Sequence, residues 1–180
     1  MRRLTTILVL ALGLLLVTAQ ASLAQNAHFK KGGEPVCTVS SSGASSSTTC
    51  KASLAGLGNG DLRIEVTASG SAVYQCSNNG GNTAPGQNRV LVGPVTAPTV
   101  IPGDQIKNGN VSFTTNPAVL TAPDTVTGAQ AGCPNPNWTG VNPTLTTTDL
   151  KMTIAQGGVT LFTCTASNPN GLSGTVPLAC

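Results

Sequence analysis

LRIEVTAS, at residues 62–69, is the clearest secondary-structure signal in the chain, because apolar and polar side chains alternate along it without a break. Such alternation is the pattern of a β-strand with one buried face, and the β-branched Ile64 and Val66 favour the same conformation. A second alternating run, AVYQC at residues 72–76, follows Ser69-Gly70-Ser71. Since Gly and Ser are common in turns, we predict that the two runs form a hairpin.

Shorter strand signals recur on both sides of this stretch. Leu150, Met152 and Ile154 alternate with polar residues, and the turn sequence QGG at 156–158 predicts a hairpin with a strand over 159–166. No amphipathic helical pattern is present after the first 24 residues. Eight or nine short strands separated by turn signals predict an all-β fold, an antiparallel β-sandwich with an immunoglobulin-like arrangement as one form of it. Further strands are expected at 36–39, 48–54, 89–95, 111–115 and 174–180.

The first 24 residues match a secretory signal peptide. The start is positively charged (MRR), residues 7–17 are apolar and uncharged, and Ser22-Leu23-Ala24 provides a cleavage site, with Ala19-Gln20-Ala21 as an alternative. The apolar run is shorter than the roughly 20 residues that a membrane-spanning helix needs. We therefore predict a signal peptide over 1–24, a secreted extracellular protein and no membrane insertion.

The remainder divides into a polar, Gly-containing N-terminal tail at 25–34, which we predict to be flexible, and one β-sandwich domain at 35–180. Charged residues make up 8% of the chain, against about 25% in a typical soluble protein. Cleavage removes Arg2 and Arg3, which leaves seven basic side chains against six acidic ones. Nucleic-acid binding needs a clustered basic surface with aromatic side chains, so we predict no nucleic-acid partner.

Six cysteines in an exported chain predict disulfide bonds, because an oxidising exterior lets such bonds persist. Their spacing does not fit a zinc site, which favours closely spaced CxxC pairs. Six cysteines allow fifteen pairings, and the sequence does not choose among them. The preferred set joins the ends of a Ser-rich hairpin, two Asn/Gly/Pro-rich loops, and the last strand with the chain end. These pairs are Cys37–Cys50, Cys76–Cys133 and Cys164–Cys180.

Few residues could support catalysis. The one histidine, His28, lies in the predicted tail, whereas a catalytic triad needs a base held rigidly against its nucleophile. A glycosidase needs two carboxylates facing each other across a cleft. Asp61 and Glu65 would share a strand face, but Arg63 on the same face favours a solvated surface. We predict no catalytic residues, no cofactor and no metal ligands. The other carboxylates are Glu34, Asp104, Asp124 and Asp149.

Trp138, in the sequence CPNPNWTG, is the one candidate ligand-binding residue. Its indole could stack on a sugar ring while neighbouring amides bind the hydroxyl groups. The alternative is a structural role, in which Trp138 covers the disulfide of Cys133. Asn110 and Asn137 each begin an N-glycosylation sequence, which matters only if the source glycosylates its proteins.

Across residues 50–138 the runs CKASLAGLGNGD, CSNNGGNTAPGQN, IKNGNVSF and CPNPNWTG resemble a group of small secreted bacterial proteins of uncharacterised function. The resemblance implies the pairings Cys37–Cys50 and Cys76–Cys133. Cys164 and Cys180 depart from the pattern of the group. The resemblance implies no activity.

Taken together, the patterns predict a secreted, non-catalytic protein with a binding or structural role and an extracellular partner or glycan as its ligand. One alternative is a glycan-binding module that uses Trp138. Another is a secreted hydrolase that uses carboxylates, which requires two of them in one cleft. Self-assembly through exposed edge strands is a third alternative.

Overall fold

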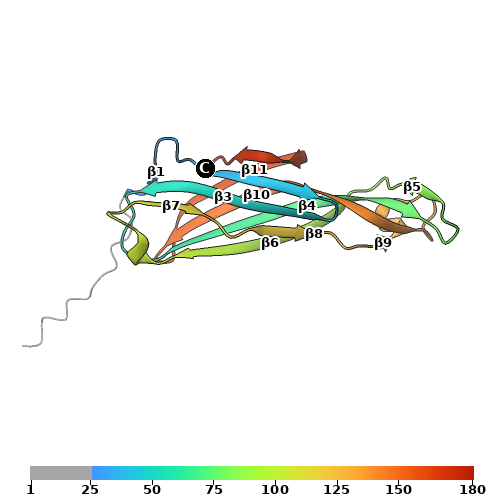
Figure 1. Cartoon of the computed structure of the whole chain (residues 1–180), viewed down its shortest axis with the longest axis horizontal. Coiled ribbons are helices and arrows are strands. Elements are labelled where there is room, and N and C mark those ends of the chain that lie inside the picture. Colours follow the sequence, from blue (N-terminus) through green and yellow to red (C-terminus); the bar gives the residue numbers. More distant parts are fainter. Residues whose placement is uncertain (1–25) are drawn as a thin grey trace, which may run out of the picture.

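The computed structural model describes residues 26–180, and the predicted signal peptide at 1–24 lies outside them. In the described residues, two antiparallel sheets of six strands each form an elongated sandwich (Figure 1). The predicted all-β antiparallel sandwich is therefore confirmed, and its immunoglobulin-like arrangement stays a prediction. The first sheet contains β1 (His28–Phe29), β2 (Val36–Ser42), β3 (Ser45–Ala55), β7 (Val111–Thr114), β8 (Ala118–Thr121) and β12 (Gly174–Pro177).

The second sheet is built on its two longest strands, β4 and β10, which pair with each other along nearly their whole length. β11 pairs with the free edge of β10, and β6 and β5 pair with successive parts of β4. Its members are β4 (Leu62–Ser77), β5 (Thr83–Pro85), β6 (Val90–Ile101), β9 (Val126–Thr127), β10 (Thr139–Gln156) and β11 (Val159–Leu172). A short 3-10 helix, η1 (Gly103–Gln105), and one helical turn, α1 (Gly128–Ala131), complete the described elements.

The core lies between the two sheets, where side chains from both form one buried cluster. The apolar positions of the alternating run point into it, because successive side chains of a strand point to opposite faces. Removing these side chains from water is the main favourable term for the fold. The largest fully buried apolar side chains include Leu54, Leu62, Ile64, Tyr74, Leu120, Met152 and Ile154.

The hairpin predicted at residues 69–71 is wrong, because β4 continues through them as one strand. A Cβ atom on Gly70 would lie 2.3 Å from the Thr146 carbonyl oxygen of β10, so only glycine allows this close approach. The pairing of β4 with β6 also shifts register between Ala68 and Gly70 of β4, as it does at a β-bulge. The glycine therefore marks a contact between two strands rather than a turn. The second predicted hairpin, β10–β11, is confirmed, with Gln156 opposite Val159.

The flexible tail predicted at 25–34 is also wrong for the residues that form β1. His28 and Phe29 pair with Ala55 and Leu54 of β3. The centroid of the Phe29 ring lies 4.5 Å from the centroid of the Phe162 ring on β11. This segment is held by contacts with residues far away in the chain, which a local pattern of polar and glycine residues does not reveal.

The three preferred disulfide pairings are all confirmed. Cys37–Cys50 joins directly opposed residues of β2 and β3, and Cys164–Cys180 ties the chain end to β11. The backbone of Ala179 also exchanges two hydrogen bonds with Thr165 beside this disulfide. Of the three disulfides, Cys76–Cys133 joins the two cysteines that are farthest apart in sequence, by 57 residues. It links β4 to the segment after α1. Among residues 26–180, no helix is long and apolar enough to cross a membrane.

Gln156 holds one end of the sandwich together and gives a first test of the fold. Its side chain is 2% exposed; Oε1 accepts a hydrogen bond from the Gly58 amide, and Nε2 donates to the carbonyl oxygens of Gly58 and Gly60. Gln156→Leu leaves these backbone groups without partners, so we expect the free energy of unfolding to fall by about 2 kcal/mol in urea denaturation. Gln105→Leu, at an exposed position of η1, is the control; equal losses in both variants would contradict this role.

Candidate functional site

The carboxylates considered for hydrolysis lie at separate places in the fold. Only one of the six, Glu34, lines one of the three surface hollows described below, and the other five line none of them. Glu65 pairs with Arg63 on the outer face of β4 at 2.7 Å, as expected for a solvated strand surface. The five lie before β4 (Asp61), on β4 (Glu65), in η1 (Asp104), between β8 and β9 (Asp124) and on β10 (Asp149).

His28 and Trp138 also lie apart from these hollows. His28 is on β1, where its Nδ1 donates to the Asn26 carbonyl oxygen at 2.7 Å. Trp138 is half-buried and packs against the core, and its backbone amide donates to Asn135 in the loop that follows Cys133. A sugar-binding role for Trp138 stays a prediction. Among residues 26–180, no group of three or more His, Cys, Asp or Glu side chains is placed to hold a metal ion.

A site that the sequence patterns did not indicate lies on the outer face of the second sheet, where β4, β5 and β10 run side by side. Here the surface is hollowed by about 480 Å³, and we call this place the amide hollow. All of its lining residues are uncharged, which favours a neutral ligand. They are Val73, Tyr74, Gln75, Thr83, Ala84, Pro85, Asn142 and Thr144.

A bulge in β10 shapes the amide hollow. The pairing of β10 with β4 shifts register between Val141 and Thr144, which leaves Asn142 and Pro143 outside the regular ladder. Proline has no amide hydrogen to give to the ladder, and asparagine tolerates the left-handed conformation that Asn142 adopts, with φ of 50°. Bulges of this kind redirect side chains and occur often beside functional sites.

The redirected side chain of Asn142 meets that of Gln75 on β4. Asn142 Nδ2 donates to Gln75 Oε1 at 3.0 Å, so the two amides form a pair with one shared hydrogen bond. The pair leaves both N–H groups of Gln75, one N–H of Asn142 and the Asn142 C=O free, and reversing both amides only exchanges these roles between the two side chains. Val73, two residues before Gln75 on the same strand face, is 40% exposed and adds an apolar wall.

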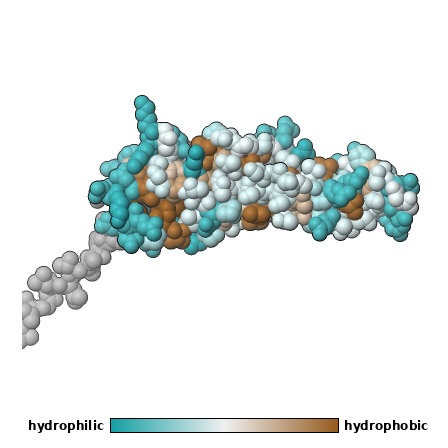
Figure 2. All heavy atoms as spheres, in the orientation of Figure 1, coloured by the Kyte–Doolittle hydropathy of each residue, from teal (hydrophilic) through white to brown (hydrophobic). Residues whose placement is uncertain are grey.

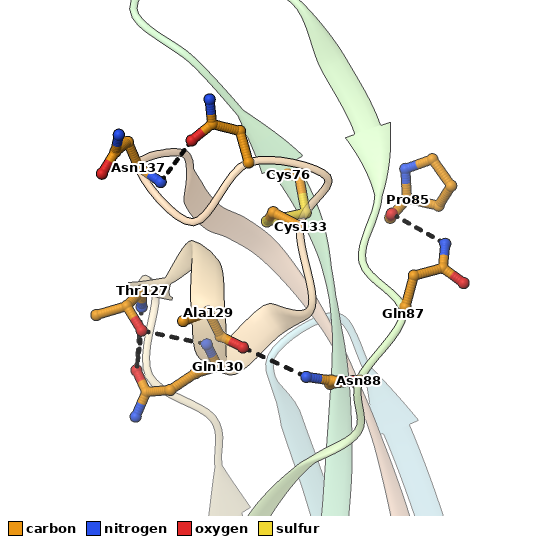
Figure 3. The surroundings of a disulfide bond; sticks show 10 residues. Cys76, Pro85, Gln87, Asn88, Thr127, Ala129, Gln130, Cys133 and Asn137 are labelled. Carbon is orange, nitrogen blue, oxygen red and sulfur yellow. Dashed lines mark hydrogen bonds between the residues drawn. A yellow bond between two sulfur atoms is a disulfide. The ribbon is translucent and has the colours of Figure 1, made fainter.

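The inner face of the same strands supports the hollow. Cys76 is buried next to Gln75, and its disulfide to Cys133 fixes β4 against the segment that follows α1 (Figure 3). Tyr74 is 1% exposed, and its hydroxyl donates to the Pro123 carbonyl oxygen at 2.9 Å. Burial, with a smaller contribution from the Asp124 charge, raises the pKa of Tyr74, so its hydroxyl remains protonated. Both neighbours of Gln75 on β4, Tyr74 and Cys76, are therefore anchored in the core.

Two further hollows lie elsewhere on the surface. One, of about 430 Å³, lies on the outer face of the first sheet and contains Glu34 and Lys51, which do not form an ion pair with each other. The other lies beside α1 and includes Thr127 and Gln130 of its capping box. Each also contains two side chains that are bonded to each other, Ser53 with Ser112 in the first and Thr127 with Gln130 in the second, but neither pair lies at a register shift between strands.

Uncharged polar residues make up much of the strand surface. Figure 2 shows residues of near-zero hydropathy along most of the visible face, with strongly hydrophilic ones gathered towards its two ends. Ser and Thr account for much of this surface; Ser40 and Ser47 lie opposite each other on the outer face of the first sheet, and the hydroxyls of Thr67 and Thr96 bond across the second. This placement is consistent with the small share of charged residues in the chain, 8%.

Asp149, on the outer face of β10, provides a test of the local hydrogen bonding. The Ser167 hydroxyl, and then that of Thr148, lower the pKa of Asp149, and the smaller effect of burial opposes them. A lowered folded-state pKa stabilises the fold above the pKa of the unfolded chain, and this contribution is lost as the pH falls through the folded value. We expect Ser167→Ala to raise the Asp149 pKa in an NMR titration, and Thr163→Ala to leave it unchanged. An unaltered pKa in Ser167→Ala would contradict the assignment.

No protein family model matches this chain, and no curated protein sequence or solved structure matches it. The resemblance to small secreted bacterial proteins therefore stays a prediction. What the chain does has to be inferred from the chemistry and geometry of its own residues.

Proposed function

We propose that this protein is secreted, acts without catalysis and binds a neutral polysaccharide through the amide hollow. The observation that carries the proposal is the pair of side-chain amides, Gln75 and Asn142, which a strand bulge holds together in an uncharged hollow. Secretion is supported by the signal-peptide pattern and by three disulfides, which persist in oxidising compartments.

A neutral carbohydrate fits the chemistry of this hollow. Sugars offer hydroxyl groups that donate and accept hydrogen bonds, and the amide pair and the hydroxyls of Thr83 and Thr144 supply partners of both kinds. Sugar rings also have apolar C–H faces, which can pack on Val73 and Pro85. No side chain in the lining carries a charge, so an ionic ligand would find no counter-charge.

Binding accounts for the site better than hydrolysis does. A carboxylate-dependent glycosidase needs two carboxyl groups on either side of the scissile bond, within about 10 Å of each other. The amide hollow contains no carboxylate. Amide side chains can orient a sugar but do not act as general acids or bases near neutral pH, so they suit a binding protein.

The test is retention on insoluble neutral polysaccharides, measured as the fraction of purified mature protein removed from solution. We expect at least one polysaccharide to retain the chain above the level of polystyrene beads. The double variant Gln75→Ala/Asn142→Gly should lose this retention, whereas Gln105→Ala/Asn108→Gly should keep it. Asn108 is a matched control because it is also left-handed, with φ of 51°, at an exposed position.

Trp138→Ala separates the amide hollow from the alternative site. Retention that survives Trp138→Ala but not the double variant supports the proposal. Retention that is lost only in Trp138→Ala would move the site to the indole. Absence of retention on every neutral polysaccharide would overturn the proposed function.

A further inference from the structure

We infer that the amide hollow selects sugar units that carry an N-acetyl group, as in polymers of N-acetylhexosamine. This inference rests on the proposed function, because it names the ligand class of the same site. It follows from the hydrogen-bonding capacity of the Gln75–Asn142 pair and from the apolar residues beside it.

The hydrogen-bonding groups of the pair match a secondary amide. Because Gln75 and Asn142 share one hydrogen bond, the pair keeps amide N–H donors on Gln75 and the amide C=O of Asn142 free for a ligand. An acetamido group carries one C=O and one N–H. A ligand amide that faces the pair can therefore form two hydrogen bonds at once, whereas a single hydroxyl can reach both partners only through one oxygen atom.

The residues around the pair match the methyl group of an acetamide. Val73 lies on β4 two positions from Gln75, a spacing of about 7 Å along the strand, and Pro85 lies directly opposite Gln75 on β5. Val73 is 40% exposed, so it provides apolar surface that a methyl group can cover. A ligand with an N-acetyl group would fill both the polar and the apolar parts of the hollow.

The absence of charge in the lining discriminates against deacetylated sugars. Removing the acetyl group leaves an amine, which is protonated at neutral pH, and no lining residue is a carboxylate that could pair with it. Plain hexose units have a hydroxyl at the same position and lose both the second hydrogen bond and the methyl contact. The three kinds of polymer therefore differ in the groups they offer to this hollow.

The position of Asn142 indicates that the pair is built into the fold. A left-handed asparagine within a long strand costs conformational free energy, and the surrounding structure has to offset this cost. The interruption at Asn142-Pro143 creates no turn, since β10 continues on both sides of it. What it does produce is the contact with Gln75, which regular pairing at this position would not give.

The experiment is a calorimetric titration of the purified mature protein with three soluble tetrasaccharides that share one linkage: of N-acetylglucosamine, of glucosamine and of glucose. We expect the N-acetylated tetrasaccharide to bind at least about tenfold more tightly than the other two, a ratio that corresponds to about 1.4 kcal/mol. Gln75→Leu should reduce this preference to less than threefold, whereas Gln105→Leu should leave it unchanged. Circular dichroism and urea unfolding check that each variant is folded.

The outcomes separate this inference from the proposed function. Equal binding of the glucose and N-acetylglucosamine tetrasaccharides, or tighter binding of the glucosamine one, would overturn the N-acetyl selectivity and leave polysaccharide binding intact. A preference that persists in Gln75→Leu would also overturn the inference, because the selectivity would then arise elsewhere. If neither these tetrasaccharides nor the insoluble polymers bind, both the inference and the proposed function fail.

Discussion

We expect removal of the Cys76–Cys133 disulfide, by Cys76→Ala and Cys133→Ala together, to lower the free energy of unfolding by about 4 kcal/mol. The bond links residues 57 apart, and the loss of loop-closure constraint on the unfolded chain grows with this separation. The loss would be a large fraction of the 5–15 kcal/mol typical of a folded domain. Urea denaturation under non-reducing conditions measures it.

The matched control is the Cys37→Ala/Cys50→Ala variant, which opens a loop of 13 residues. The same relation gives a loss of about 3 kcal/mol for this bond, so the two variants should rank in order of loop length. Binding at the proposed site should also weaken in the Cys76–Cys133 variant, because Cys76 is the buried neighbour of Gln75 on β4. Equal stability of the two variants, or a reversed order, would contradict the explanation by loop closure.

Gly70→Ala is a substitution for which we expect a large effect from a single methyl group. The new Cβ would lie 2.3 Å from the Thr146 carbonyl oxygen, a distance that real Cβ atoms do not reach. β10 must then move away from β4 along the longest strand pairing in the fold, and we expect a loss of about 3 kcal/mol in urea unfolding.

Gly80→Ala is the control for this substitution. A Cβ there would meet its nearest neighbours, the side chains of Asn78 and Asn82, at 3.4 and 3.6 Å, and the position lies in a loop. We expect its effect to stay within about 0.5 kcal/mol. If Gly70→Ala were as stable as Gly80→Ala, the close approach of the two strands would not be the reason for glycine at this position.

Local sequence patterns predicted the elements that depend on local chemistry. The alternation of LRIEVTAS identified a strand with one buried face, and QGG between two alternating runs identified the β10–β11 hairpin. The disulfide preference was correct: Cys37–Cys50 joins the ends of a hairpin and Cys164–Cys180 ties the chain end, whereas Cys76–Cys133 joins two loops that are 57 residues apart. Each of these features depends on residues that are close in sequence or on a small number of covalent alternatives.

Features that depend on contacts between distant residues could not be predicted in this way. Gly70 was interpreted as part of a turn because the pattern cannot show that β10 passes beside it. The pairing of Phe29 with Leu54 was missed for the same reason. Gln75 and Asn142 are 67 residues apart and meet only through the register of β4 and β10. The one local sign was Asn142-Pro143 within the strand at residues 139–156.

Polysaccharide binding at the Gln75–Asn142 pair is the central claim, and NMR titration of the ¹⁵N-labelled mature protein tests it most directly. On addition of the N-acetylglucosamine tetrasaccharide, we expect the side-chain NH₂ signals of Gln75 and Asn142 and the backbone amide of Val73 to shift together and to saturate. The indole N–H signal of Trp138 should stay unchanged. Shifts centred on Trp138, or saturable binding that leaves the two side-chain amides unmoved, would contradict the claim.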